Sequence, residues 1–287
     1  MEKKFERNGF GKRFSTMLSV DLRRMFRSRS FYIIVASCLV APILIMVMVT
    51  MMEGTVSVNP QTGIPGEPLE GFDNVWQIIG SVSDGSMGGA MGGVGGDASS
   101  GDPSAAMGSM SITSMCNINM LYFAIAALVC IFVSEDFRSG YAKNLFTVRA
   151  KKTDYVASKT IACSLGAACM VLAFVAGSMI GGAVAGLPFE MVGFDAVELV
   201  FCLLAKVVLV TVFVPIYLVM SVAAKEKLWL SLLLSMGVGM FLFMMIPMVS
   251  PLNATPVHVI LCLAGGAMFG FGLGAVSNLV LKKTSLV

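Results

Sequence analysis

The residues most able to do chemistry lie in a short segment between two long uncharged runs. Residues 133–160 read VSEDFRSGYAKNLFTVRAKKTDYVASKT and contain nine charged residues. The first half, 135–148, is predicted to be an amphipathic helix, because four apolar side chains recur in it at helical spacing: Phe137, Tyr141, Leu145 and Val148. Asp136, Arg138 and Lys143 lie off this apolar face. Apolar side chains flanked by charges favour a surface that docks a partner protein. A solvated basic loop that only orients the chain is the alternative.

Lys206 is the one basic residue placed inside a predicted membrane helix. A charge there is costly unless it reaches the surface, pairs with an acid or faces water. Glu198 and Cys202 precede it at four-residue intervals on the same helix face, one to two turns from the outer end. We therefore expect Lys206 to extend to the outer surface, towards Glu198. Lining of a polar cavity is the alternative.

Catalytic and metal sites have little support in the sequence. The single histidine, His258, cannot provide a zinc site built from histidines or a serine–histidine triad. The seven cysteines lack CxxC spacing, so neither a thiolate metal site nor a disulfide framework is indicated. The apolar runs also lack paired aspartates. We expect no enzymatic activity, no metal site and no cofactor on this chain.

The composition indicates an all-α integral membrane protein. Hydrophobic residues make up 56% of the 287 residues and charged residues only 13%, against about 25% charged in soluble domains. Long uncharged runs match the roughly 20 residues that a membrane helix needs, and SPLNATP at 250–256 divides the longest of them. We predict a lead-in at 1–30 and a six-helix domain at 31–287, with spans near 31–52, 115–134, 158–186, 199–222, 228–249 and 257–281.

The basic residues predict the orientation of these spans. Nineteen of the twenty Lys and Arg fall in the N-terminal segment, the 135–159 connector, the 224–228 turn or the C-terminal tail. With six spans these four segments share one face, which the positive-inside rule makes cytoplasmic. We therefore expect both termini and the connector to lie inside, in the cytoplasm.

Two segments outside the spans have patterns of their own. Residues 53–114 form an acidic outer loop with a flexible Gly-rich middle. Phe72, Trp76 and Ile79, with Leu69 before them, predict a short helix on the outer leaflet, with a lid as the alternative. Before span one, an apolar helical face indicates an amphipathic helix at the inner surface: Phe14, Leu18, Leu22, Met25 and Phe26. Its arginines lie largely off that face, ready for lipid phosphates: Arg23, Arg24, Arg27 and Arg29.

Small residues repeat every four positions in two spans. Gly177 and Gly181 form one such pair, and Gly266, Gly270 and Gly274 form a longer series. Faces of this kind let helix backbones approach closely. We expect packing between helices of this chain, with contact to a second copy as the alternative.

The connector also resembles a known family, the type 2 permease class of ATP-binding-cassette (ABC) transporter membrane subunits. Members have six spans, both ends inside, an amphipathic helix before span one and a charged connector between spans two and three. The resemblance lies in a series of residues in matching order: Glu135, Gly140, Lys143, Lys151 or Lys152, Tyr155 and Lys159. Val148 stands near the position where the family usually has proline.

The resemblance implies that the connector contains a coupling helix that docks on an ATPase subunit. The implied coupling residues are Glu135, Phe137, Arg138, Gly140, Tyr141, Lys143, Leu145, Tyr155 and Lys159. ATP and Mg²⁺ would bind the partner, because this chain lacks the Gly-x4-Gly-Lys-Ser/Thr phosphate loop. Expected partners are that ATPase, a second permease subunit and the lipid of a bacterial cytoplasmic membrane, with no nucleic acid.

The expected function is export of a hydrophobic or amphipathic small molecule or peptide. Two alternatives remain open at this point. One is an immunity protein that captures a toxic peptide in the membrane without transport. The other is an ion or metal pathway, which would require carboxylates or histidines in the spans that are almost absent here.

Overall fold

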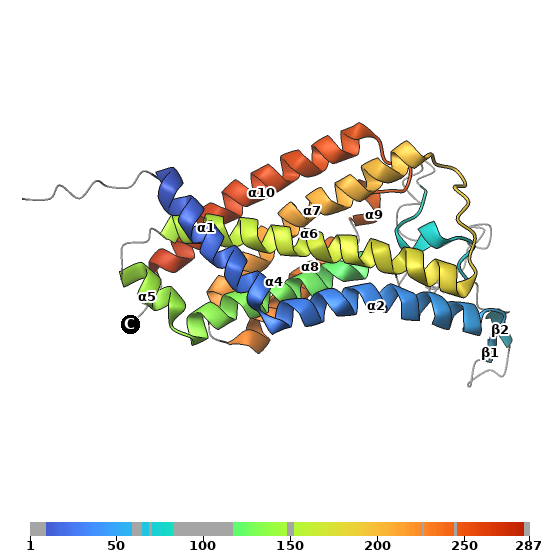
Figure 1. Ribbon diagram of the computed structural model, residues 1–287, viewed down its shortest axis with the longest axis horizontal. Coiled ribbons are helices and arrows are strands. Elements are labelled where there is room, and N and C mark those ends of the chain that lie inside the picture. Colours follow the sequence, from blue (N-terminus) through green and yellow to red (C-terminus); the bar gives the residue numbers. More distant parts are fainter. Residues whose placement is uncertain are drawn as a thin grey trace, which may run out of the picture.

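The chain folds into a bundle of long helices that run along one axis (Figure 1). The computed structural model describes residues 10–58, 65–68, 71–82, 117–147, 152–225, 227–243 and 246–283. The α-helices are α1 (Phe10–Arg27), α2 (Arg29–Met52), α4 (Leu121–Arg138), α5 (Tyr141–Thr147), α6 (Lys152–Ala185), α7 (Ala196–Ala224), α8 (Leu228–Phe243), α9 (Ile246–Val249) and α10 (Pro256–Lys283). The 3-10 helices are η1 (Val75–Ile78) and η4 (Ile118–Met120), and strands β1 (Val56–Val58) and β2 (Pro65–Pro68) pair antiparallel.

Five helices are long and apolar enough to cross a membrane: α2, α4 with η4, α6, α7 and α10. The sixth predicted span, 228–249, is divided into α8, of 16 residues, and α9, of four, with residues 244–245 outside the described ones. Pro247 is the second residue of α9, where its missing N–H leaves no hydrogen bond unmade. The helical membrane class is therefore found, with five full-length spans and one shorter apolar helix.

The helices extend beyond the apolar runs that predict them. α4 continues to Arg138, four residues past the expected end of span two. α6 begins at Lys152, six residues before the expected start of span three. Hydropathy reports the part of a helix that lipid can cover, whereas the hydrogen-bonded helix continues into the polar region. The connector is consequently shorter than predicted.

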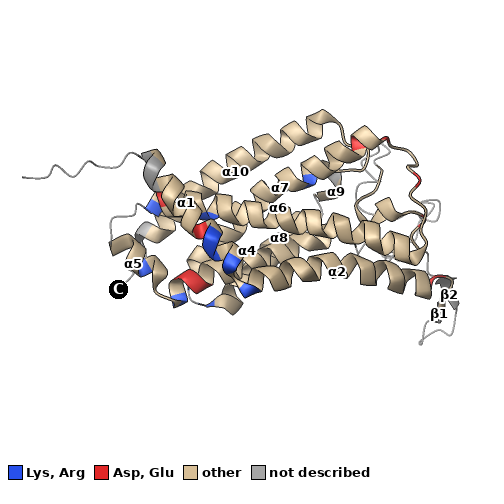
Figure 2. Ribbon diagram, viewed as in Figure 1, with Lys and Arg blue, Asp and Glu red and all other residues tan. Residues whose placement is uncertain are grey.

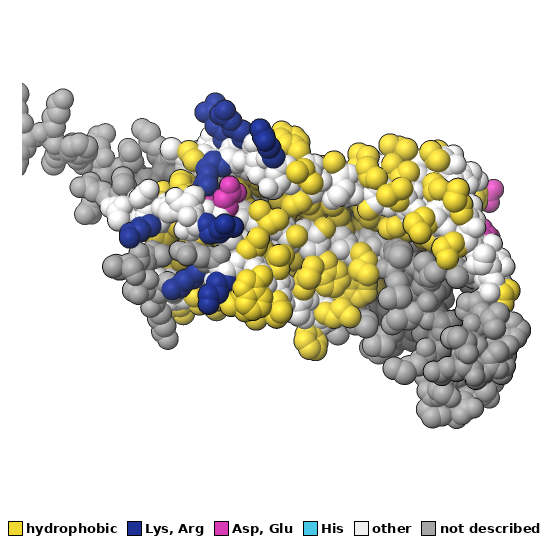
Figure 3. Space-filling view, turned by 90° about the horizontal axis from the view of Figure 1, so that it is seen from below, with side chains coloured by type: hydrophobic (Ala, Val, Ile, Leu, Met, Phe, Trp, Pro, Cys, Tyr) yellow, Lys and Arg dark blue, Asp and Glu magenta, His cyan; other side chains and the backbone are white. Residues whose placement is uncertain are grey.

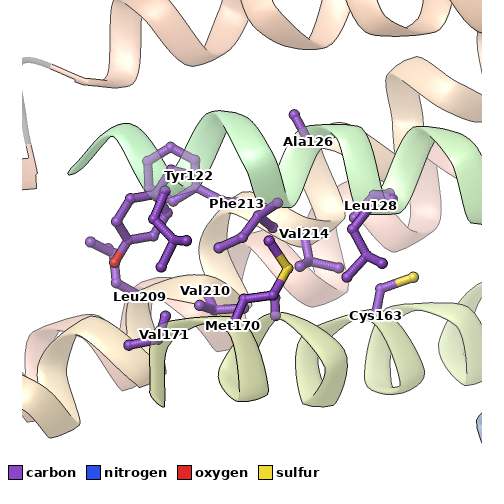
Figure 4. Packing of buried hydrophobic residues seen from close by; sticks show 14 of the residues in the cluster. Tyr122, Ala126, Leu128, Cys163, Met170, Val171, Leu209, Val210, Phe213 and Val214 are labelled. Atoms are coloured by element: carbon purple, nitrogen blue, oxygen red, sulfur yellow. The ribbon is translucent and has the colours of Figure 1, made fainter. Parts of the chain in front are cut away.

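The core lies where α4, α6 and α7 meet (Figure 4). Tyr122 of α4 packs on Phe213 of α7, with ring centroids 4.6 Å apart, and its hydroxyl donates to the carbonyl of Lys206 over 3.0 Å. Met170 and Val171 close the core from α6. All these side chains are nearly or fully buried. α7 packs against α4, α6, α8 and α10, and α6 packs against α1, α2, α4, α7 and α10, so these two helices form the centre of the bundle.

The outside of the bundle is apolar along its middle and charged at one end. Hydrophobic side chains cover the middle of the face drawn in Figure 3, and Lys and Arg gather at the end that carries α1 and α5 (Figures 2 and 3). We call this the basic end. Ile33 on α2 and Phe271 on α10 are 68% and 83% exposed. Such faces are suited to lipid.

Elements far apart in the sequence meet at the basic end. α1, α5, the turn between α7 and α8 and the end of α10 lie there, while β1, β2 and η1 lie at the opposite end (Figure 1). This grouping is the one that the basic residues predict. α1 crosses α6, and the Met25 side chain packs against Gly166. α1 is thus part of the bundle, whereas its exposed arginines Arg23 and Arg27, together with Arg29 at the start of α2, remain available to lipid.

The segment predicted as an outer-leaflet helix instead packs inside the bundle, at the end opposite the basic end, and we call it the plug. Phe72, Val75, Trp76 and Ile79 are all buried, so the prediction of a membrane-surface helix is wrong. η1 is a single turn, capped by the Asn74 side chain. The Trp76 indole N–H donates to the carbonyl of Phe189 over 3.1 Å, a contact that fixes the turn beneath the α6–α7 loop. Leu69 lies outside the described residues.

Only some of the glycines in the two small-residue series lie at close contacts between helices. An added Cβ at Gly177 would meet the Leu39 carbonyl of α2, and one at Gly181 would meet the α2 backbone at Ile43. At Gly266 it would meet Thr211 of α7. Gly274 has Val156 only at 4.0 Å, and Gly270 has no neighbour within 4 Å among the described residues. The close approach is therefore between α2 and α6 and between α7 and α10.

Gly177→Ala is expected to destabilise the bundle by about 1–3 kcal/mol, because the new methyl group forces α2 and α6 apart. Gly270→Ala is the matched control. There the methyl group meets open space, and removing a helical glycine is neutral or stabilising by about 0.5–1 kcal/mol. Thermal unfolding of the two purified variants in one detergent measures both. Equal losses would show that the α2–α6 contact is not close.

Candidate functional site

A cluster of buried charges joins three helices at the basic end. Asp21 and Arg24 come from α1, Asp136 from α4 and Lys159 from α6. Asp21, Asp136 and Lys159 have fully buried side chains, while that of Arg24 is 30% exposed. Buried charges of this kind persist only when they are paired and hydrogen-bonded.

Each charge in the cluster has a partner of opposite sign. Lys159 Nζ lies 2.9 Å from Asp21 Oδ1 and 2.7 Å from Asp136 Oδ2. Arg24 Nη1 donates to Asp136 Oδ1 over 2.7 Å. Two acids and two bases thus balance, and the alternating chain Arg24–Asp136–Lys159–Asp21 connects α1, α4 and α6.

Hydroxyl groups and aromatic rings complete the cluster. The Tyr155 hydroxyl donates to Asp136 Oδ2 over 3.0 Å, and the Ser158 hydroxyl donates to Asp21 Oδ2 over 2.6 Å. Lys159 Nζ also lies 3.9 Å from the centre of the Phe132 ring, a cation–π distance. These contacts replace the water that the charges lose on burial.

Helical spacing explains why these residues meet. Asp21 and Arg24 are three residues apart on α1, and Tyr155 and Lys159 are four apart on α6, so each pair lies on one helix face. Asp136 is in the last turn of α4, in the part that extends beyond the apolar run. The cluster therefore depends on the helices continuing past the hydrophobic segments.

The short helix α5 is attached to this cluster by its aromatic residues. The Arg24 guanidinium carbon lies 3.9 Å from the centre of the Tyr141 ring. The Phe146 ring meets Tyr155 edge to face, with centroids 5.4 Å apart and an interplanar angle of 72°.

A separate contact joins the start of α6 to the end of α10. The Nζ group of Lys152 donates a hydrogen bond to the Leu281 carbonyl over 2.6 Å.

Where α5 contacts the cluster, burial and neighbouring charges shift the pKa values of two side chains outside the membrane spans, Arg24 and Tyr141. Burial opposes the charge of Arg24, but the combined attraction of Asp136 and nearby groups outweighs it and raises the pKa of the guanidinium. Burial is also the main cause of the raised pKa of the Tyr141 hydroxyl. Arg24 therefore stays charged and Tyr141 neutral at every physiological pH, so their cation–π contact is independent of pH.

The residues of the predicted coupling helix are divided between two helices in the structure. Instead of one helix over 135–148, α4 ends at Arg138 and α5 begins at Tyr141. Gly140 forms the turn between them with φ +71°, a left-handed conformation that favours glycine. Val148 and Lys151 lie outside the described residues.

The apolar side of this segment faces its own bundle. Phe137 is 9% exposed, Tyr155 and Lys159 are fully buried, and Tyr141 and Leu145 are partly buried. The prediction that Phe137 enters a groove of a partner is therefore wrong, because its side chain packs inward. For the partly buried Tyr141 and Leu145, docking on a partner stays a prediction. The outward side of α5 is polar: Lys143, Asn144 and Thr147. Glu135 and Arg138 are also exposed, on the last turn of α4.

Lys206 is a second buried charge, near the end of the bundle opposite the basic end. It is 1% exposed, and its Nζ donates to Ser250 Oγ over 3.1 Å. The prediction that it extends to the surface towards Glu198 is wrong. Glu198 instead accepts from the Asp195 backbone N–H over 3.0 Å and so caps the first turn of α7. The side chain of Lys206 stays inside because Ser250, at the end of α9, supplies a polar partner.

Lys206→Met is expected to leave the protein folded, with stability within about 1–2 kcal/mol of wild type, because an apolar chain of similar length replaces a desolvated charge. Ser250→Ala is the matched control. It removes the same hydrogen bond but leaves the buried ammonium without it, at a cost of about 1–3 kcal/mol. Unfolding temperatures of the two variants in detergent compare them. A larger loss for Lys206→Met would contradict this assignment.

Sequence reasoning missed most of the buried cluster. Asp21, Arg24, Asp136 and Ser158 are not among the predicted site residues. One signal was present: Asp21 lies four residues from both Met17 and Met25, on the inward face of α1, where an acid requires a partner. Among the described residues, no group of three or more His, Cys, Asp or Glu could hold a metal ion.

Comparison with known proteins gives one result. A family model described as "ABC-2 family transporter protein" matches residues 89–245. This is more than half of the 287 residues, and it includes the connector, α5 and the α4 and α6 parts of the cluster. No curated protein and no solved structure matches the chain.

Proposed function

Because the chain belongs to the ABC-2 transporter family, we propose that it is the permease subunit of an ATP-driven exporter whose ATPase is a separate chain. The substrate is a hydrophobic or amphipathic small molecule or peptide. The complex lies in a bacterial cytoplasmic membrane and contains a second permease subunit. The basic end faces the cytoplasm, with both termini inside, as the positive-inside rule requires.

The observation that carries this proposal is the attachment of α5 to the buried cluster. An exporter needs an element that contacts the ATPase on one side and the membrane helices on the other. α5 has an exposed polar side and an inward side held by Arg24 and Tyr155. No other described helix of this size lies at the basic end.

The cluster gives a physical route from α5 to the spans. A displacement of α5 acts on Arg24 through Tyr141 and on Tyr155 through Phe146. Both of those residues contact Asp136 of α4. α1, α4 and α6 therefore move as one unit, because separating any of them would leave a buried charge without its partner. ATP and Mg²⁺ act on the partner subunit, and this chain converts the movement into opening of a path between its helices.

The docking side is tested by crosslinking from α5. A photoreactive benzoylphenylalanine at position 143 is expected to capture a protein that carries a Gly-x4-Gly-Lys-Ser/Thr loop. Position 192, which is 65% exposed between α6 and α7 at the opposite end, is the control. Mass spectrometry of crosslinked native membranes identifies the captured chain. Capture of that ATPase from position 192, or from neither position, would refute the docking surface.

The orientation has its own test. In a cysteine-free background, a cysteine at 192 should react with a membrane-impermeant maleimide added to intact cells, because its loop lies outside. A cysteine at 143 should react only after permeabilisation. The reverse pattern would place the basic end outside and would exclude an ATPase partner there.

A further inference from the structure

A cavity at the basic end lies outside the buried cluster. Its volume is about 450 Å³, within the roughly 300–1,000 Å³ of small-molecule sites. Three helices border it: the first turn of α2, the last two turns of α4 and the first residue of α8. The lining residues are Ser30, Ile131, Ser134, Glu135, Arg138, Ser139 and Leu228.

One part of the cavity wall is suited to an anion. Ser30 is in the first turn of α2 and Leu228 begins α8, so the N-termini of two helices border it. The first N–H groups of a helix have no partner within that helix. Ser28, the residue before α2, makes no side-chain cap. Helix N-termini favour phosphate, and the Arg138 guanidinium adds a fixed positive charge with several donors.

The other part of the wall is suited to a cation. Glu135 contributes a carboxylate from the last turn of α4, at the negative end of that helix dipole. Glu135 and Arg138 are three residues apart, yet no ion pair joins them among the described residues, and both are exposed. Two unpaired charges of opposite sign in one cavity favour a ligand that carries both charges.

The Ser134 hydroxyl lies directly behind the cavity wall and is closed to solvent. This residue is 2% exposed, and its hydroxyl has no hydrogen-bond partner in the described structure. A buried hydroxyl without a partner costs about 1–3 kcal/mol, so such groups are rarely left unpaired. Rotation of this side chain about its Cα–Cβ bond would present the hydroxyl to a phosphate oxygen in the cavity.

From these contacts we propose that the cavity binds the headgroup of an amine-bearing phospholipid such as phosphatidylethanolamine. The phosphate lies between Arg138, the Ser134 hydroxyl and the two helix N-termini, and the ammonium pairs with Glu135. The position fits a lipid, because the cavity lies where the apolar helices α2 and α8 begin, next to the exposed arginines of α1. The proposal does not depend on the ATPase partner.

Native mass spectrometry of the purified full chain tests the site. The probes are phosphatidylethanolamine and phosphatidylglycerol with identical acyl chains, added in equal amounts. The wild type should retain phosphatidylethanolamine preferentially. Arg138→Gln should lower retention of both lipids by roughly tenfold or more, the value of one charge-assisted hydrogen bond. Glu135→Gln should abolish the preference for the amine while phosphatidylglycerol binding is kept.

Two further variants separate a specific site from general attraction and from misfolding. Arg23→Gln removes an exposed α1 charge outside the cavity lining and should change nothing. Ser134→Ala removes only the hydroxyl, keeps all charges and should still weaken retention. A wild type without preference for the amine lipid, or an Arg23→Gln loss equal to that of Arg138→Gln, would overturn the proposal.

A competition experiment distinguishes a membrane lipid from a soluble ligand of the same chemistry. Glycerophosphoethanolamine has the headgroup without acyl chains. If it fails to displace bound phosphatidylethanolamine at a hundredfold excess, the site is a lipid site, as proposed. Full displacement would assign the cavity to a soluble phosphoethanolamine compound and would refute the lipid assignment.

Discussion

Replacing Lys159 with methionine is expected to lower the free energy of unfolding by about 3–5 kcal/mol, the usual cost of removing one partner from a buried ion pair. Lys159 Nζ contacts both Asp21 and Asp136. Without Lys159, the carboxylates of Asp21 and Asp136 remain buried, and Arg24 neutralises only that of Asp136. Chemical or thermal unfolding in detergent, followed by tryptophan fluorescence, measures the loss.

Two controls make this expectation specific. Lys143→Met removes an exposed lysine of α5 and should change stability by less than about 0.5 kcal/mol. Asp21→Asn combined with Lys159→Met leaves Arg24 and Asp136 as a balanced pair, so the double variant should lose less than the sum of its single variants. Additive losses would show that Lys159 and Asp21 do not interact in the membrane protein.

The sequence predicts the cluster only in part. Tyr155 and Lys159 are expected as coupling residues from the family resemblance, and the structure places both in the cluster. Asp21, which pairs with Lys159, and Arg24, which pairs with Asp136, lie more than 100 residues earlier in the chain. No local spacing connects α1 with α6. A long-range contact between charges requires the packing angle of two helices, which hydrophobic periodicity does not contain.

The fold, like the cluster, is predictable only where local sequence determines it. Uncharged runs predict the long spans α2, α6, α7 and α10, and most of the predicted ends fall within a few residues of the observed ones. The reason is that a membrane helix needs about 20 apolar residues. Two features are not predictable in this way. The plug around Trp76 is held by tertiary contacts such as that with Phe189. Likewise, Lys206 turns inward because Ser250, 44 residues later, meets it in space.

Tyr141→Ala combined with Leu145→Ala is expected to separate ATP hydrolysis from movement of the membrane helices. Both side chains face the bundle, and the truncation removes the Arg24 contact and the apolar packing of α5. The exposed side, with Lys143 and Thr147, is unchanged. The ATPase should therefore still co-purify. The equilibrium constant for ATP-driven movement of the spans should fall at least tenfold, which corresponds to a loss of about 1.4 kcal/mol or more in coupling free energy.

Spin labels at 192 and 257, both exposed at the end opposite the basic end, report that movement. In the complex with the ATPase, ATP and vanadate should change the distance between the labels in the wild type but not in the double alanine variant. Lys143→Glu with Thr147→Glu is the matched opposite change, because it alters only the outward side. It should release the ATPase while α5 stays packed on the bundle. If the double alanine variant instead releases the ATPase and the glutamate variant keeps it, the apolar side of α5 is the docking surface after all, and α5 must leave the bundle to bind.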